Sequence, residues 1–400
     1  MLQALRHVGG RHGAAFALVV ALVAAAPASA VGRPHEPRVH PADVRNAQLL
    51  AVAEARMREG KAAPALEALW SIDDSRARLD RFTRARLLGL ASFALGRFEE
   101  TSAALDEAGR IAVGRGSSLR GELWIVRARA EHALGRCAPA LAALTRAGPA
   151  RVRDVDAVLV QASCENEGGL RAAAIDTLST GLLTIDDPRL RVMRAHRLLE
   201  LGARAAAQGD ARAALPRAGV DELLVLASAF VERSAVAEAT EILRVLRRRF
   251  PDDVRAHVAL SRLSTGREAA QAAVEAARLD PRHAADATEL LRRDNALGAA
   301  LRESAGIGDE RARLRARLAA LVDARAWDRA LALRQALDSA GLGADDAVRY
   351  ALAYAAFSVG DDPHASALLD GIVDATLFER ASRLRVAIAA CAEAEAPCAR

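Results

Sequence analysis

The sequence predicts an all-α solenoid, built by stacking one helical hairpin on the next. From Ala42 onward, apolar residues return at spacings of three and four, which is the pattern of amphipathic helices. Alternation of β-branched residues is almost absent, so we expect essentially no sheet. Polar breaks recur every 10 to 20 residues, and a small residue follows most breaks by five positions. Such a residue lets the backbone of a second helix approach the first.

The first thirty residues are predicted to be a secretory signal peptide. A basic start leads into an apolar run over 14–26 and then into a small-x-small site, with cleavage expected after Ala30. A helix of that run spans only about 20 Å, whereas the hydrocarbon core of a membrane measures about 30 Å. We therefore expect an exported protein, periplasmic or extracellular, with no stable membrane insertion after cleavage. Residues 31–41 contain three prolines and predict a linker.

The clearest hairpin lies between Leu223 and Pro251. Its spacings describe two short helices that pack through small residues and end at a proline, at Leu223, Leu226, Ala227, Phe230, Ala239, Leu243, Leu246 and Pro251. Weaker copies recur along most of the chain, with turns predicted at Gly60, Gly96, Gly135, Gly168, Gly209, Ser234, Arg325 and Gly360. Glycine suits these turns because it tolerates the positive φ that ends a helix.

These repeats resemble the tetratricopeptide repeat, a helix-turn-helix unit of about 34 residues. Trp124, Ala128, Gly135 and Ala140 fit its signature, and the turns from Gly60 to Gly96, Gly135 and Gly168 follow at 36, 39 and 33 residues. The resemblance covers roughly 42–390. It implies a right-handed solenoid of about eight units, in which the first helix of each unit lines a groove for partners.

The predicted organisation is less regular toward the C-terminus. We expect a first repeat array over 42–281, whose last units are irregular, and an irregular helical connection over 282–310. Further repeats over 311–390 end in a capping helix, because the last unit of such an array must be covered. A cysteine-containing tail follows over 391–400. The irregular middle either bends the solenoid or divides it into two lobes, and it is also the place where a separate site could lie.

Composition and motifs argue against several classes of protein. The chain has 56 basic and 51 acidic residues, a net charge of +5, and only 3% aromatic residues. Nucleic-acid binding would call for a basic stripe with stacking aromatics, so we expect no nucleic-acid partner. The sequence contains none of the zinc-protease, nucleophile-elbow, phosphate-loop or Cys-x-x-Cys motifs. We therefore predict no enzyme, no catalytic residue, no metal and no cofactor.

Four cysteines predict disulfides, because an even number in an exported chain favours them. In the repeat arrangement Cys137 opens the second helix of one unit, and Cys164 lies near the end of the first helix of the next, so a bridge between them is feasible. Cys391 and Cys398 can pin the tail. Free, buried thiols are the alternative, and four cysteines allow three pairings.

The resemblance also implies which residues face the groove. We expect seven side chains to project into it, from Arg58, Arg86, Arg129, His132, Tyr350, Tyr354 and Phe357. The first four can receive acidic or hydrogen-bonding groups. The three aromatic residues can grip an apolar segment or, alternatively, pack beneath the capping helix.

The expected function is that of a non-catalytic scaffold or adaptor, which binds a protein or peptide in its groove. This expectation rests on the fold, which by itself does not specify a function. Two alternatives remain open. One is a cell-envelope or peptidoglycan-associated factor that binds glycan or acts on it as an enzyme. The other is a structural subunit of an envelope complex.

Overall fold

The structure is a computed structural model that describes residues 40–73, 75 and 80–393. Within these ranges it is helical and contains no strand, which confirms the predicted all-α solenoid. The predicted signal peptide, residues 1–30, lies outside the described residues, as does 31–39 of the predicted linker. Pro41 is not linker, because it is the first residue of helix α2 (Pro41–Arg58) and follows an N-cap at His40. None of the described helices is long and apolar enough to cross a membrane.

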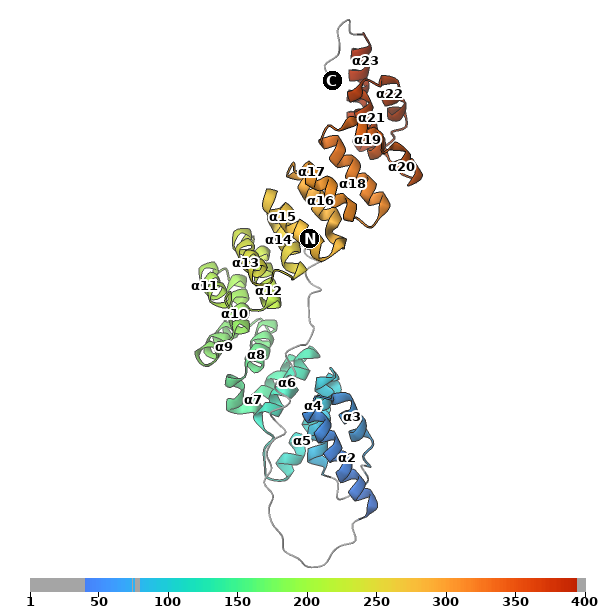
Figure 1. Cartoon of the computed structure of the whole chain (residues 1–400). Helices are drawn as coiled ribbons and strands as arrows, with labels where there is room; N and C mark the ends of the chain where they lie inside the picture. The colour runs from blue at the N-terminus through green and yellow to red at the C-terminus, as the bar shows by residue number, and fades with distance from the viewer. Residues whose placement is uncertain (1–39, 74, 76–79, 394–400) are drawn as a thin grey trace, which may run out of the picture. The chain divides into compact units, whose positions relative to one another are not determined.

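The chain divides into two compact units, residues 1–233 and residues 234–400 (Figure 1). This boundary lies before the predicted irregular connection, 282–310, which falls wholly within unit 2. It also separates the two helices of the clearest hairpin in the sequence, since Leu223 belongs to unit 1 and Pro251 belongs to unit 2. The physical reason is that the spacing of apolar residues specifies which helices follow one another in sequence. Which helices belong to one unit depends on how they pack against each other.

Unit 1 is a succession of helix pairs. Its helices are α2, α3 (Ala62–Trp70), α4 (Arg81–Ala94), α5 (Phe98–Gly114), α6 (Gly121–Ala133), α7 (Cys137–Ala147), η2 (Gly148–Arg153), α8 (Val155–Glu167), α9 (Arg171–Thr184), α10 (Pro188–Glu200), α11 (Arg204–Ala214) and α12 (Val220–Glu232). We call α2, α4, α6, α8 and α10 the first helices and their followers α3, α5, α7, α9 and α11 the second helices. Each first helix packs on its second helix and on the first helix of the next pair.

The five hairpin turns of unit 1 all contain a glycine with positive φ. These glycines are Gly60, Gly96, Gly135, Gly169 and Gly202, with φ between 71° and 79°. A residue with a Cβ rarely adopts this conformation, which explains why glycine recurs at the turns. The fourth turn contains the predicted Gly168 as well as Gly169, which has the positive φ, whereas Gly209 lies inside α11 rather than at a turn.

Glycines inside the helices of unit 1 allow close packing. A Cβ at Gly89 of α4 would lie 2.6 Å from Cγ of Leu105 in α5, and a Cβ at Gly109 of α5 would lie 2.8 Å from the ring of Trp124 in α6. Both distances are too short for carbon atoms in contact. At Gly89 and Gly109, large apolar side chains therefore pack directly against the helix backbone. These contacts add to the packing of the apolar faces of the amphipathic helices.

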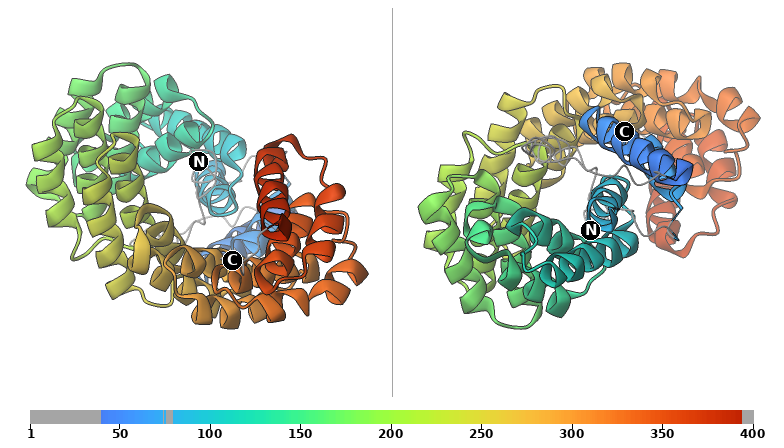
Figure 2. Two further views of the ribbon diagram at one scale, coloured as in Figure 1. Left: turned by 90° about the horizontal axis from the view of Figure 1, so that it is seen from above. Right: turned by 90° about the horizontal axis from the view of Figure 1, so that it is seen from below.

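Unit 2 has shorter and more broken helices. They are α13 (Val236–Arg249), α14 (Val254–Leu263), α15 (Gly266–Leu279), η3 (Pro281–His283), α16 (Ala284–Arg293), α17 (Leu297–Glu303), η4 (Ser304–Gly306), α18 (Glu310–Asp323), α19 (Trp327–Leu331), α20 (Arg334–Ser339), α21 (Asp346–Val359), α22 (Asp362–Asp370) and α23 (Ala375–Glu393). The segment predicted to be an irregular connection, 282–310, forms the pair α16 and α17, which packs on α15 and α18. Two further views show the succession of paired helices in each unit (Figure 2).

Candidate functional site

Charged side chains connect successive first helices of unit 1. Asp156 of α8 lies between two arginines, with its carboxylate 2.8 Å from Arg129 of α6 and 2.9 Å from Arg189 of α10. The guanidinium of Arg129 also stacks over the ring of Phe93 in α4, 4.9 Å from its centroid. Arg189 is held further by Asp187 at 3.2 Å. We call these five residues the unit 1 ladder, because they link α4, α6, α8 and α10 in order.

The N-terminal end of this face carries two of the predicted groove residues. Arg86 of α4 lies 3.8 Å from the Glu54 carboxylate of α2, and Arg58 lies 3.4 Å from the same carboxylate. Arg86 is partly buried, whereas Arg58 is exposed. The three predicted arginines, Arg58, Arg86 and Arg129, therefore each have a carboxylate of this chain beside them. Because Arg58 and Arg86 share the one carboxylate of Glu54, their positive charge is compensated only in part.

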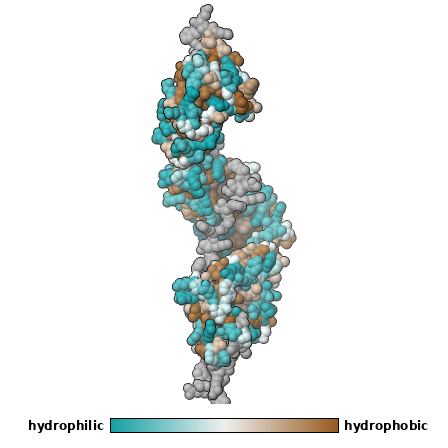
Figure 3. Space-filling view, turned by 90° about the vertical axis from the view of Figure 1, so that its right-hand side faces the viewer, coloured by the Kyte–Doolittle hydropathy of each residue, from teal (hydrophilic) through white to brown (hydrophobic). Residues whose placement is uncertain are grey.

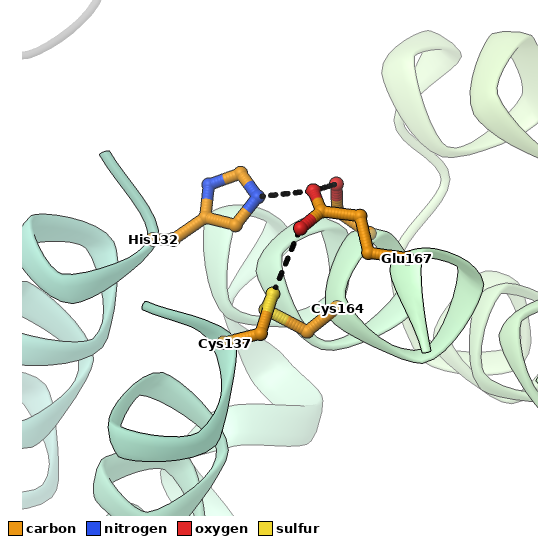
Figure 4. Close-up of a disulfide and its surroundings, with 5 residues drawn as sticks. His132, Cys137, Cys164 and Glu167 are labelled. Atoms are coloured by element: carbon orange, nitrogen blue, oxygen red, sulfur yellow. Dashed lines mark hydrogen bonds and ion pairs between the residues drawn. A yellow bond between two sulfur atoms is a disulfide. The ribbon is translucent and has the colours of Figure 1, made fainter. Parts of the chain in front are cut away.

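His132 lies on the same face, next to the disulfide of unit 1 (Figure 4). Its Nε2 atom is 3.8 Å from the carboxylate of Glu167 in α8, and the other carboxylate oxygen lies 3.2 Å from Sγ of Cys137. Cys137 is bonded to Cys164, with 5.2 Å between their Cα atoms. This is the pairing that the sequence made feasible, and it ties the start of α7 to α8. The same glutamate, Glu167, also accepts from the hydroxyl of Ser163 in α8, at 3.5 Å.

A second polar cluster follows at the C-terminal ends of α8 and α10. Arg197 donates to Glu200 at 2.7 Å, and the Nε2 atom of His196 lies 3.8 Å from the same glutamate. When the side-chain amide of Asn166 is oriented to satisfy both of its partners, it bonds Glu200 at 3.2 Å and Arg197 at 2.9 Å. The cluster extends the polar row from α8 to α10. Its members are half-buried, so their positions are held by packing as well as by charge.

Burial lowers the pKa of His196 below its ordinary value of 6.5, and the nearby Arg197 guanidinium lowers it further. The folded chain therefore keeps this imidazole neutral at pH values where the unfolded chain binds a proton. Stability contributed by His196 is present above about pH 6.5 and is lost as the pH falls below that value.

We expect the His196→Gln variant to lose less stability than the wild type when the pH falls from about 7.5 to about 5.5. The measurement is the free energy of unfolding in denaturant at each pH, with the imidazole titration followed by NMR. An identical pH dependence for both proteins would contradict this expectation, as would a His196 imidazole that titrates above its ordinary value.

The three aromatic residues predicted for the groove lie in unit 2 and do not act together. Phe357 is wrong as a groove residue, because it is buried in the core that α21, α22 and α23 share. Tyr350 is half-buried against that core, and burial raises the pKa of its phenol. Tyr354 is exposed and packs edge-on against Trp327, with 5.6 Å between ring centroids. The alternative reading, packing beneath the last helix, therefore describes Phe357 and Tyr350.

The remaining cysteines lie at the end of the chain. Cys391 belongs to α23 rather than to a tail, because that helix continues to Glu393. It is also disulfide-bonded, and the described residues include no free cysteine. Cys398 lies outside the described residues. Among the described residues, no group of three His, Cys, Asp or Glu side chains is placed to hold a metal ion.

Sequence reasoning missed the acidic members of the ladder. Asp156 and Arg189 are 33 residues apart, close to one repeat, and both stand near the start of a first helix. A search for opposite charges at equivalent positions of neighbouring repeats would have found this pair. Asp187 is weaker evidence for the ladder in the sequence, because it is the N-cap of α10. Aspartate is favoured at an N-cap whether or not it also forms an ion pair.

No protein-family model and no curated protein matches this sequence. Among solved structures, the chain is similar to the human IFIT1 dimer with PPP-AAAA, at 14% identity and a TM-score of 0.32 over 86% of this chain and 94% of that one. Yeast Tom70 matches at 13% identity and a TM-score of 0.29, over 88% and 98%. The TPR2AB-domain:pHSP90-complex of yeast Sti1 matches at 15% identity and 0.24, over 58% and 99%.

Proposed function

We propose that this chain is a non-catalytic scaffold that acts after export and binds a protein or peptide segment on the first-helix face of unit 1. The observation that carries the proposal is the unit 1 ladder. It places partly exposed side chains from four successive first helices in one row, held by contacts of 2.8 to 3.2 Å and by the stacking of Arg129 on Phe93.

The geometry of this row favours an extended, polar segment. Each ladder side chain is already oriented by a neighbour, so a ligand would not have to order it on binding, and preorganised groups bind more tightly for that reason. Because Asp156 and Glu54 lie among the arginines, the face offers hydrogen-bond acceptors as well as donors. We therefore propose a partner that supplies hydrogen-bonding groups of both kinds, donors as well as acceptors.

Site-specific photo-crosslinking in cells tests the proposal. Ser163 of α8 and His196 of α10 are suitable positions, since each follows a ladder residue by seven positions and so lies on the same helical face. Matched controls are Leu183 of α9 and Arg110 of α5, which are exposed on second helices. We expect the same crosslinked partner from both first-helix positions and none from the controls. Equal adducts from the controls, or none from Ser163 and His196, would overturn the proposal.

A further inference from the structure

The last helix of unit 2, α23, has two apolar faces. Its inner face packs against α21 and α22 through Ala381, Leu384 and Ile388, which are buried. Its outer face carries Phe378, which is 60% exposed, and Val386, which is 69% exposed. Figure 3 shows hydrophobic residues at this end of unit 2. The terminal helix of a repeat array is expected to present a polar outer face, whereas this helix exposes these two large apolar side chains there, among polar ones.

Four apolar residues and a central serine form a stripe on this outer face, and their spacings are symmetric about the serine. We call it the outer stripe of α23, and it consists of Ala375, Phe378, Ser382, Val386 and Ala389. Spacings of three and four place these residues on one side of a helix. Phe378 and Val386 lie four residues before and after Ser382, and the two alanines lie seven residues before and after it. Ser382 is therefore the centre of the stripe, and it is small.

We propose that the outer stripe is an interface with a second copy of this chain, in which the two α23 helices pack antiparallel with Ser382 at the two-fold axis. In this register Phe378 of each copy packs against Val386 of the other, and the small Ser382 lets the two backbones approach at the crossing point. A two-fold interface requires one surface to be complementary to itself, and the symmetry of the stripe about Ser382 meets that requirement.

The charges beside the stripe fit the same arrangement. Glu379 and Arg383 are exposed on one flank of the stripe, one turn apart, and form an ion pair with each other. When the helices run antiparallel about Ser382, Glu379 of one copy lies next to Arg383 of the other, and the two-fold axis produces this contact twice. A flank that carried one sign of charge would repel its own copy, whereas this flank is complementary to itself.

The mass of the purified chain in solution tests the interface. Sedimentation velocity over a dilution series should show a dimer that dissociates to a monomer, because a single helix pair is a small interface. Phe378→Glu/Val386→Glu should give a monomer throughout, while the control Leu183→Glu, which changes an 85% exposed residue of unit 1, should leave the dimer unchanged. A wild-type chain that is monomeric at every concentration overturns the proposal, as does a Phe378→Glu/Val386→Glu variant that still dimerises.

The register is tested separately by charge and by crosslinking. Glu379→Arg should raise the dissociation constant about tenfold or more, and Glu379→Arg/Arg383→Glu should restore it, because the swap re-forms the opposite-charge contact. Ser382→Cys should form a disulfide-linked dimer under mild oxidation, whereas Arg380→Cys, an exposed position outside the outer stripe, should not. Failure of the charge swap to restore the dimer, or equal crosslinking at both positions, would contradict the antiparallel arrangement.

Discussion

Breaking the disulfide of unit 1 is expected to lower its free energy of unfolding by about 3 to 4 kcal/mol. Cys137 and Cys164 are 27 residues apart in sequence and join α7 to α8. Closing a loop of this length removes conformational entropy from the unfolded chain, and the cost of losing the bond follows from that entropy. The bond also holds together two successive helix pairs, beside the contact between His132 and Glu167.

Cys137→Ser is the variant to use, since it breaks the bond and leaves the buried Cys164 in the core. Denaturant unfolding of the wild type and the variant, both without reductant, measures the difference. Reductant alone is a poorer comparison, because it would also reduce the disulfide of Cys391. A loss below about 1 kcal/mol would show that the bond does not constrain the unfolded chain as expected.

The second large effect is expected at the ion pair between Arg194 and Asp210, and Arg194→Met should cost about 3 kcal/mol. The Asp210 carboxylate of α11 is only 5% exposed, and it accepts from Nε and Nη2 of Arg194 in α10 at 2.7 and 2.6 Å. Removing the arginine leaves a buried carboxylate, with only Arg191 nearby at 4.0 Å. An unpaired buried charge is far more costly than an unpaired surface charge.

The double variant Arg194→Met/Asp210→Leu separates the cost of the orphaned charge from the cost of lost packing. It should recover most of the lost stability, because an apolar pair of similar volume can replace a buried ion pair without penalty. Arg110→Met, at a surface pair, is the control and should be nearly neutral. A double variant as unstable as Arg194→Met would contradict this account.

The local features of the fold could be predicted because each depends on a few neighbouring residues. Amphipathic spacing predicts a helix wherever it recurs, and a glycine at the break predicts the turn, as Gly60, Gly96 and Gly135 show. The fourth turn holds a Gly-Gly pair, in which Gly168 caps α8 and Gly169 has the positive φ. Ser234 and Arg325 adopt positive φ without being glycine, at 57° and 52°. The turns at these two residues were predicted from the spacing of the hairpin and not from the residue type.

The face of unit 1 could be predicted only in part. Arg129 was expected to project from a first helix, and it does, but its partner Asp156 lies on the next hairpin and 27 residues away. Phe357 was expected to line the groove from a first helix. It is buried instead, because α23 covers that side of α21. Periodicity indicates which residues share a face of one helix, and it does not indicate which neighbouring helix covers that face.

The sequence by itself determined the helices, their order, the hairpin turns and a feasible pairing of Cys137 with Cys164. Tertiary structure alone decided that the two helices of the clearest hairpin belong to different units, that the groove arginines lie beside Glu54 and Asp156, and that Phe357 is core. The physical reason is the distance along the chain over which each kind of interaction acts. Helix and turn preferences act over about four residues, whereas ion pairs and burial depend on how one hairpin is rotated against the next.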